Sequence, residues 1–337
     1  MEQLLISNTP HIRAKTTTRG IMLDVIIALV PASVMGVVYF GWKAAMLIFL
    51  SVFACVGSEV IFRLIKKERF GNIFKTMDLT SAVTGLLLAL NLGTNILDTV
   101  AGWFMPILGG IFSIVVVKML FGGTGKNFVN PALAGRIFLL ISFSAALTST
   151  MAATNIASIY PSTVAAGETV LPELYGTTPN YSAMSNLDLF LGTGLTGCIG
   201  ETCKAALLVG GVYLVIKGVI DWKYPVIFMV VEGLMACLLA GTFRMFLPSI
   251  LSGGLMIGAI FMATDYVTTP NTTLGNIIYF AVLGIITALL RFRNGSEVVS
   301  YCIFFMNFTV PLIDRYIKPR PFGWQKKPKQ KKEGGAA

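Results

Sequence analysis

Residues 44–64 read AAMLIFLSVFACVGSEVIFRL, and residues 21–40 before them read IMLDVIIALVPASVMGVVYF. Each run is close to the roughly 20 apolar residues that a helix needs to cross about 30 Å of hydrocarbon. Eight more runs of this kind lie at roughly 79–96, 100–120, 132–150, 203–220, 225–242, 250–264, 276–291 and 298–314. The sequence therefore predicts an all-α polytopic membrane protein with about ten transmembrane helices.

The composition supports the same class. Of the 337 residues, 55% are hydrophobic and 12% are charged, and the mean hydropathy is +0.77. An average soluble protein carries about 25% charged residues. This chain has too little polar surface to cover a soluble globule of its size. An ordinary cytosolic enzyme, a disordered chain and a nucleic-acid-binding module are therefore excluded.

The net charge of +10 lies mostly beside the predicted spans. Eight of the 26 Lys and Arg residues lie from Arg315 to Lys332, and five lie from Arg63 to Lys75. Cytoplasmic segments of membrane proteins are enriched in these residues. The placement predicts that both termini face the cytoplasm and that the chain contacts the lipid bilayer and no nucleic acid.

Cysteine and histidine usage gives no sign of a disulfide framework or a metal site. The five cysteines are an odd number scattered through apolar segments, which does not fit paired disulfides. His11 is the single histidine, so no metal site is expected. The cysteines are Cys55, Cys198, Cys203, Cys237 and Cys302.

The predicted spans divide the chain into five segments. These are a cytoplasmic segment at 1–20, five spans within 21–150, an extracytoplasmic loop at 151–202, five spans within 203–314 and a basic cytoplasmic tail at 315–337. Phe104-Met105-Pro106 followed by Gly109-Gly110 resembles Phe246-Leu247-Pro248 followed by Gly253-Gly254. The echo is consistent with two related five-helix halves, and chance similarity explains it equally well.

A glycine-rich loop at 122–136 reads GGTGKNFVNPALAGR. Its glycines permit close backbone approach to a ligand. The amides of Asn127 and Asn130 offer donors and acceptors, and Lys126 and Arg136 offer positive charge. The order is not that of a Walker loop. A ligand-binding loop and a plain tight loop between two spans both remain open.

Other polar segments allow more than one interpretation. Asp265, within MATDYVTTP at 262–270, is able to bind a cation, relay a proton or cap a neighbouring helix. Asp78 needs only the capping role. The outer segment 173–180 is typical of a turn. The glycine-dense stretch 192–202 is either a re-entrant or cofactor-cradling segment or a close helix contact.

Six blocks in order carry a resemblance over roughly residues 8–316. They are PHIR with MLDVIIAL, DLT through LNL, FGGTGKNFVNPALAGR, GET, FMATDYVTTP, and MN with PLID. With ten spans between them, the chain resembles the RnfD family, the D subunits of the Rnf complex, which is the ferredoxin–NAD oxidoreductase of prokaryotic cytoplasmic membranes. It is similar, more distantly, to NqrB, the B subunit of the sodium-pumping NADH–quinone oxidoreductase.

The resemblance implies FMN joined through its phosphate to a threonine hydroxyl of the outer loop. Alignment on the Thr-Pro pair puts Thr178 in the acceptor place, with Thr177 as the fallback. Tyr175, Gly176 and Thr177 stand where Ser-Gly-Ala is usual, so the motif departs from the family pattern. The implied surroundings of this flavin are Gly176, Gly192, Gly194 and Glu201.

The resemblance also implies a non-covalent riboflavin, for which Asn127, Asn130 and Arg136 are the candidate contacts. Asp265, Glu201 and Thr264 are the candidates for ion coupling, with Na⁺ and H⁺ not distinguished. The implied partners are the other proteins of the Rnf complex, especially its covalent-FMN G subunit and its A and E membrane subunits, together with a flavin transferase. The chain lacks ferredoxin-like cysteine runs and G-x-G-x-x-G, so partners are expected to handle ferredoxin and NAD.

Two functions from different classes follow. The first is a flavin-carrying electron-transfer subunit of a complex that couples electron flow to Na⁺ or H⁺ translocation. The alternative is a secondary transporter or channel with no redox role. A structural anchor subunit is a third interpretation. Only the first requires a flavin on the outer loop.

Overall fold

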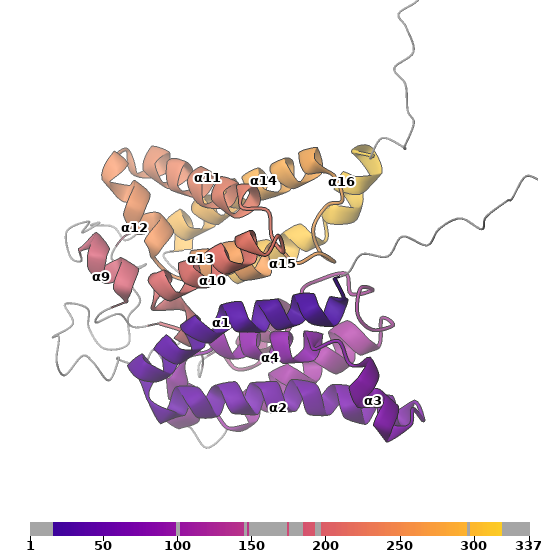
Figure 1. The fold of residues 1–337 in the computed structure, drawn as a ribbon. Coiled ribbons are helices and arrows are strands. Elements are labelled where there is room, and N and C mark those ends of the chain that lie inside the picture. Colours follow the sequence, from indigo (N-terminus) through magenta and orange to yellow (C-terminus); the bar gives the residue numbers. More distant parts are fainter. Residues whose placement is uncertain are drawn as a thin grey trace, which may run out of the picture.

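The computed structural model describes residues 16–98, 102–144, 147, 174, 185–192, 197–294 and 297–318. These residues form helices and connecting turns, and no strand occurs among them. Figure 1 shows the longer helices packed side by side along roughly one direction, with several of the short helices inclined to them. The all-α prediction is therefore confirmed for the part of the chain that the structure describes.

The first half of the chain forms six α-helices and two irregular helices. Thr17 caps the first of them by accepting a hydrogen bond from the Gly20 amide at 3.2 Å. Gly41, at φ 72°, separates the first two long helices, a backbone conformation that favours glycine. The elements are α1 Thr18–Phe40, α2 Trp42–Ile65, α3 Phe70–Thr76, α4 Thr80–Leu90, the 3-10 helix η1 Thr94–Asp98, α5 Phe104–Ile111, the π-helix η2 Phe112–Met119 and α6 Pro131–Ser142.

The second half follows a similar plan. Its elements are α9 Asn186–Leu191, the 3-10 helix η4 Ile199–Glu201, α10 Lys204–Ile216, α11 Lys223–Ala240, the 3-10 helix η5 Phe243–Met245, α12 Phe246–Leu251, α13 Leu255–Ile257, the π-helix η6 Gly258–Met262, α14 Thr273–Asn294, α15 Val299–Asn307 and α16 Val310–Tyr316.

Ten full-length spans are not confirmed. Within the described residues four helices, α1, α2, α11 and α14, are long and apolar enough to cross a membrane. Two bent pairs raise the number to as many as six: α3 with α4, and Phe243–Leu251 with Leu255–Met262. Three further apolar helices, Phe104–Met119, Pro131–Ser142 and Lys204–Ile216, are shorter. Hydropathy finds apolar runs but does not report where a run breaks, so the count of ten stays a prediction.

The two bent pairs are alike in geometry. Each bends by 69°. A residue with positive φ stands at each break: Leu79, at 64°, precedes α4, and Gly253, at 57°, lies between α12 and α13. Each half also contains a π-helix, η2 in the first and η6 in the second. Broken helices and π-helical segments are frequent at functional sites.

The order of elements repeats between the halves. A helix, a long helix and a bent pair occur as α1, α2 and α3–α4, and again as α10, α11 and the pair around Gly253. The equivalent helices α1 and α10 run antiparallel, because Asp24 near the start of α1 bonds Tyr213 near the end of α10 at 2.7 Å. The predicted sequence echo lies on α5 and α12, which hold different places in this order.

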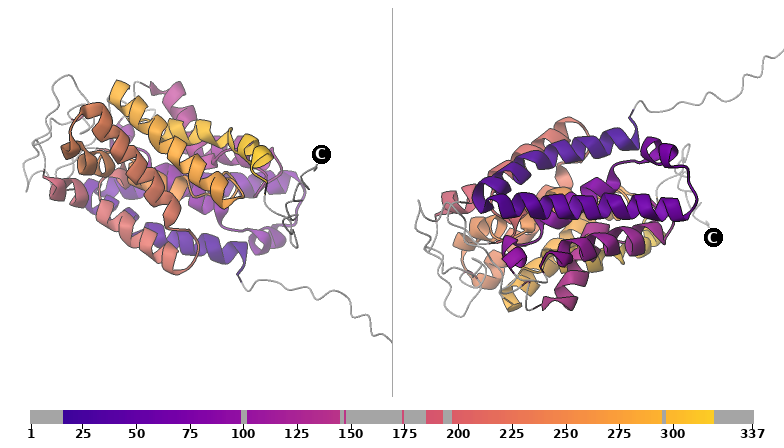
Figure 2. Two further views of the ribbon diagram at one scale, coloured as in Figure 1. Left: turned by 90° about the horizontal axis from the view of Figure 1, so that it is seen from above. Right: turned by 90° about the horizontal axis from the view of Figure 1, so that it is seen from below.

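The bundle has two distinct ends, visible in Figures 1 and 2. One end carries α3, α16 and the start of α1, and we call it the α3 end. The opposite end carries α9 and α12, and we call it the α9 end. Large apolar side chains such as Phe53, Leu238 and Ile216 are exposed along the sides. Such a surface is expected where lipid or partner helices cover a membrane protein.

Candidate functional site

A cavity of about 410 Å³ opens between the two halves near the α3 end. The first half contributes the start of α1, the start of α4 and the loop before α6, and the second contributes the end of α10, η6 and the turn after it. The volume falls within the range of small-molecule pockets, about 300–1,000 Å³. The polar lining residues are Thr18, Thr80, Thr84, Lys118, Thr124, Asn127, Asn130, Thr264, Asp265 and Tyr266.

The cavity joins two groups of residues that the sequence predicted separately. Asn127 and Asn130 were candidate ligand contacts, and Thr264 and Asp265 were candidates for ion coupling. All four line the same cavity. The two groups are more than 130 residues apart in the sequence, so only the fold reveals that they line one cavity.

The asparagines also shape the loop that carries them. The Asn130 side chain caps α6 by accepting a hydrogen bond from the Ala132 amide at 3.0 Å, and Pro131 follows at the first helical position. Its amide nitrogen donates to the carbonyl of Met262 in the second half at 3.3 Å. Asn127 donates to the Val129 carbonyl at 3.0 Å. These bonds hold both amides at the cavity wall.

Asp265 lies in the turn after η6. Its carboxylate accepts hydrogen bonds from the Val267 amide at 3.4 Å and the Thr268 hydroxyl at 3.3 Å. The Thr264 hydroxyl donates to the Ile260 carbonyl at 2.6 Å. Burial raises the pKa of the Asp265 carboxyl, although the two hydrogen bonds oppose the rise. Asp265 therefore makes local hydrogen bonds within its own turn and also lines the cavity.

A buried charged cluster reaches the cavity through Lys118 and Thr80. The Lys118 ammonium lies 3.0 Å from Glu59 Oε2 and 3.8 Å from Asp78 Oδ1. It also donates to the hydroxyl of Thr80 and, at 3.2 Å, to that of Ser81. Ser81 in turn donates to Glu59. The side chains of Lys118 and Glu59 are 3% and 0% exposed, so their charges are compensated within the protein.

Arg136 lies away from the cavity, which differs from its predicted place beside Asn127 and Asn130. Its guanidinium donates to Asn91 Oδ1 at 2.6 Å and to the Ser300 hydroxyl at 2.8 Å. It also donates to Glu201 Oε1 at 3.4 Å and approaches the Cys198 thiol at 3.8 Å. The sequence placed Glu201 with the outer flavin and Arg136 with a cytoplasmic loop. The fold joins them because Arg136 on α6 and Glu201 on η4 both reach the same buried interior.

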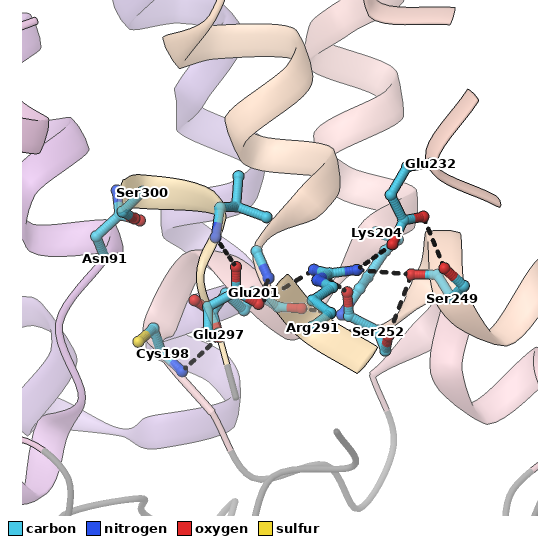
Figure 3. A network of polar contacts seen from close by, with 12 residues as sticks. Asn91, Cys198, Glu201, Lys204, Glu232, Ser249, Ser252, Arg291, Glu297 and Ser300 are labelled. Carbon is cyan, nitrogen blue, oxygen red and sulfur yellow. Dashed lines mark hydrogen bonds and ion pairs between the residues drawn. The ribbon is translucent and has the colours of Figure 1, made fainter. Parts of the chain in front are cut away.

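A second charged cluster lies toward the α9 end, shown in Figure 3. The Arg291 guanidinium bonds Glu232 Oε1 at 3.1 Å and Glu297 Oε2 at 3.2 Å. It also donates to the carbonyls of Ser249 at 3.0 Å and Ser252 at 3.3 Å. The Ser249 hydroxyl donates to Glu232 Oε2 at 2.6 Å. Arg291 and Glu232 are both 0% exposed.

The sequence analysis did not single out Glu59, Lys118, Glu232 or Arg291. A signal was present, since an ionisable residue inside an apolar run is expensive unless it is paired and has a role. Glu59 stands within the run at 44–64, four residues before Arg63, to which it pairs at 2.5 Å. That spacing places two side chains on the same face of a helix.

Several predicted residues lie outside the described residues. They are Thr178, Thr177, Gly176 and Gly194. Gly192 ends α9 with φ 86°. A Cβ on Gly192 would meet the backbone of Thr202, so glycine there lets α9 pack closely against the segment before α10.

Apolar helices that enclose paired ionisable residues define a multi-pass membrane protein with buried ion pairs in its interior. Comparison with known proteins gives the family. The model of the NQR2, RnfD, RnfE family matches residues 5–323, and the chain belongs to that family.

The chain is similar over nearly its whole length to named members of this family. The chain is 42% identical, over 98% of each chain, to the D subunit of the Na(+)-translocating ferredoxin:NAD(+) oxidoreductase complex of Acetobacterium woodii. It is 36% identical to the D subunit of the proton-translocating complex of Clostridium ljungdahlii, over 94% of this chain and 96% of that one. It is 31% identical to the D subunit of the ion-translocating oxidoreductase complex of Escherichia fergusonii, over 95% and 99%. The relatives are subunits of bacterial ion-translocating oxidoreductase complexes.

Proposed function

We propose that this chain is a flavin-carrying electron-transfer subunit of an ion-translocating ferredoxin:NAD oxidoreductase complex and helps to couple electron flow to the movement of Na⁺ or H⁺. The observation that carries the proposal is the cavity between the halves, lined by Asn127, Asn130, Lys118 and Asp265. The names of the relatives support the complex and its reaction.

The cavity lining fits a non-covalent flavin without phosphate. One part of the wall is apolar and consists of Met22, Val25, Val83, Leu87 and Phe261, which suits the flat faces of an aromatic ring system. The polar part offers amide, hydroxyl, ammonium and carboxyl groups, and hydrogen bonds and charge from such groups tune a flavin. Arg136 belongs to the buried ion pairs and is not proposed as a contact.

A second flavin, FMN attached covalently to Thr178 or in its absence to Thr177, is also proposed, with Gly176, Gly192, Gly194 and Glu201 around it. The support is the motif resemblance, because both threonines lie outside the described residues. A bound flavin accepts and releases one or two electrons. The chain's task is to fix its position and exclude competing reactions.

We place the α3 end in the cytoplasm and the α9 end outside. The basic residues Lys66, Lys67, Arg69 and Lys75 surround α3, in agreement with the enrichment of positive charge on the cytoplasmic side. The loop with Thr178 then faces outward, where the proposed partner is the covalent-FMN G subunit of the complex. The A and E membrane subunits and a flavin transferase complete the proposed set of partners.

Flavin analysis of the purified whole complex tests the proposal. After acid precipitation, the expected result is FMN mass on the peptide that contains Thr178 and a free flavin in the supernatant. Thr178→Ala should remove the peptide-bound FMN and keep the free flavin. Thr84→Trp, which fills the cavity, should keep the peptide-bound FMN and remove the free flavin. Each variant is the control for the other.

Two outcomes contradict the proposal. A chain that carries neither flavin, from a host that has the flavin transferase, would favour the secondary transporter. A free flavin whose amount is unchanged in Thr84→Trp would place the non-covalent site elsewhere. FMN mass that moves to Thr177 in Thr178→Ala would identify the second acceptor and leave the proposal intact.

A further inference from the structure

The two halves are related by inversion, and their contacts support this beyond the order of elements. On α1, Asp24 bonds Tyr213 of α10 at 2.7 Å, while a Cβ on Gly36 would meet the side chain of Ile199 just before α10. The start of α1 therefore lies beside the end of α10, and the end of α1 lies near its start. In transporters built from inverted halves, each half can adopt the conformation of the other. This exchange closes one end of the protein and opens the opposite end.

The charged clusters lie on corresponding second helices, although their serines lie on opposite arms of the two bent pairs: Ser81 follows the first bend and Ser249 precedes the second. Glu59 on the second helix of the first half bonds Ser81 of the bent pair and Lys118 of η2. Glu232 on the second helix of the second half bonds Ser249 of the bent pair and Arg291 of the next long helix. One cluster lies at the α3 end and the other lies toward the α9 end, as inversion requires.

The two ends differ in what occupies the space between the halves. At the α3 end, the starts of α1 and α4 and the ends of α10 and η6 border the cavity. Inversion puts the matching space between the ends of α1 and α4 and the starts of α10 and α13. There, η4 fills it: a Cβ on Gly200 would lie 2.7 Å from Ile257 and 2.9 Å from Leu90. Ile199, Leu90 and Ile257 are buried.

An ion pair ties the η4 side chains to the first half. Arg136 is held by Asn91 at 2.6 Å and by Ser300 at 2.8 Å. Its contact with Glu201 of η4 is longer, at 3.4 Å. The backbone of η4 adds a bond from the Ile199 amide to the Leu92 carbonyl at 3.2 Å. Arg136 thus has the shorter hydrogen bonds, whereas the Glu201 carboxylate accepts one from the Cys198 amide at 3.4 Å and the Glu201 carbonyl accepts one from Lys204.

We propose that η4 is a movable plug at the α9 end, held closed by the Arg136–Glu201 ion pair, and that its release opens the inverted counterpart of the cavity at the α3 end. Opening the pair frees the carboxylate of Glu201, and the cargo proposed for it is a small cation; Arg136, Lys204 and Arg291 balance the acids of this region while the pair is closed. The identity of this cargo rests on the proposed function, whereas the opening is measurable without it.

Native cysteines report the position of the plug. Cys198 and Cys203 flank η4 and are 5% and 6% exposed, and Cys302 lies on α15 and is 2% exposed. The purified whole complex in lipid nanodiscs is treated with a small charged methanethiosulfonate, and labelling of this chain is followed by peptide mass spectrometry. In the wild-type protein all three thiols should react slowly.

Glu201→Gln removes the ion pair and should raise the labelling rate of Cys198 or Cys203 about tenfold, within the usual range of coupling between two states. The matched control is Glu297→Gln, because Glu297 pairs with Arg291 inside the second half. It removes a charge that is 8% exposed, against 5% for Glu201, and that accepts hydrogen bonds from Arg291, Gly254 and Val299, and it should leave both rates unchanged. Cys302 should stay protected in both variants.

Changes in thiol ionisation need a separate control, because Glu201 and Arg136 both lie beside Cys198. The double variant Arg136→Gln/Glu201→Gln removes both charges and should label as fast as Glu201→Gln. Unchanged labelling in both variants would overturn the plug, and so would an equal rise in Glu297→Gln. Flavin content measured on the same samples separates this result from a failure of the proposed function.

Discussion

Glu59 and Glu232 hold equivalent places in the two halves of the chain. Each is a fully buried carboxylate on the long helix that precedes the bent pair of its half. Each accepts a hydrogen bond from a serine of the following bent pair and pairs with a basic side chain beyond it. The acid, serine and base recur together, whereas the surrounding apolar residues differ. The charged clusters therefore mark the internal relationship better than the apolar sequence does.

The buried Arg291 should be essential for stability. Arg291→Ala leaves Glu232 and Glu297 without their shared cation and should destabilise the protein by about 3–5 kcal/mol. Arg293→Ala, two residues away and exposed, should change stability by less than about 0.5 kcal/mol. The measurement is thermal unfolding of the purified complex. Equal melting temperatures for the two variants would contradict the role given to Arg291.

The Asn130 side chain should be measurable as a helix cap. Asn130→Ala removes the acceptor for the Ala132 amide and should cost about 1 kcal/mol. Asn130→Asp keeps that acceptor but loses the donor to the Met262 carbonyl. It should recover most of the stability in thermal unfolding. An aspartate variant as unstable as the alanine variant would show that the contact with Met262 matters more than the cap.

The Asp265 carboxyl should stay protonated above its ordinary pKa of 3.8. Burial disfavours the ionised form, so its folded-state pKa is raised. Any stability that the proton contributes is present at low pH and is lost as the pH rises through that pKa. Infrared spectroscopy of the complex should show a protonated carboxyl band that disappears as the pH rises through this raised pKa and is absent in Asp265→Asn. Loss of the band at or below pH 3.8 would contradict the raised pKa.

Close contact between α1 and α10 should depend on Gly210. A Cβ at this position would meet the carbonyl of Ala28, so Gly210→Ala should force the helices apart and cost about 1–3 kcal/mol. Gly57 on α2 has no neighbouring atom within 4 Å of such a Cβ. Gly57→Ala should instead stabilise the protein by up to about 1 kcal/mol. Melting temperatures that move in the same direction would contradict this difference.

Sequence alone predicted the all-helical membrane class and located the helices. The runs at 21–40 and 44–64 became α1 and α2, and α1 continues through Pro31. The bends at Leu79 and Gly253 were not predicted, because Leu79 carries no local signal for a positive φ. The π-helices η2 and η6 were also missed, because they share the composition of α-helices.

The candidate site was predicted in pieces. Asn127, Asn130, Thr264 and Asp265 were chosen for their chemistry, and the fold assembles them around one cavity. Arg136 was grouped with its sequence neighbours, but its long side chain reaches Glu201 instead. No local sequence pattern predicts this ion pair, because Arg136 and Glu201 meet only in the folded protein. The flavin attachment at Thr178 stays a prediction.

The buried ion pairs toward the α9 end have an electrical consequence. Arg136, Lys204 and Arg291 carry three positive charges, and Glu201, Glu232 and Glu297 carry three negative ones. When all are ionised they cancel, so a membrane voltage exerts no net force on the group moving as one body. Separating Glu201 from Arg136 moves charge against the field, at up to about 2.3 kcal/mol per elementary charge for each 100 mV crossed. The membrane voltage therefore acts on the opening of this pair, and its sign decides whether it favours the open or the closed state.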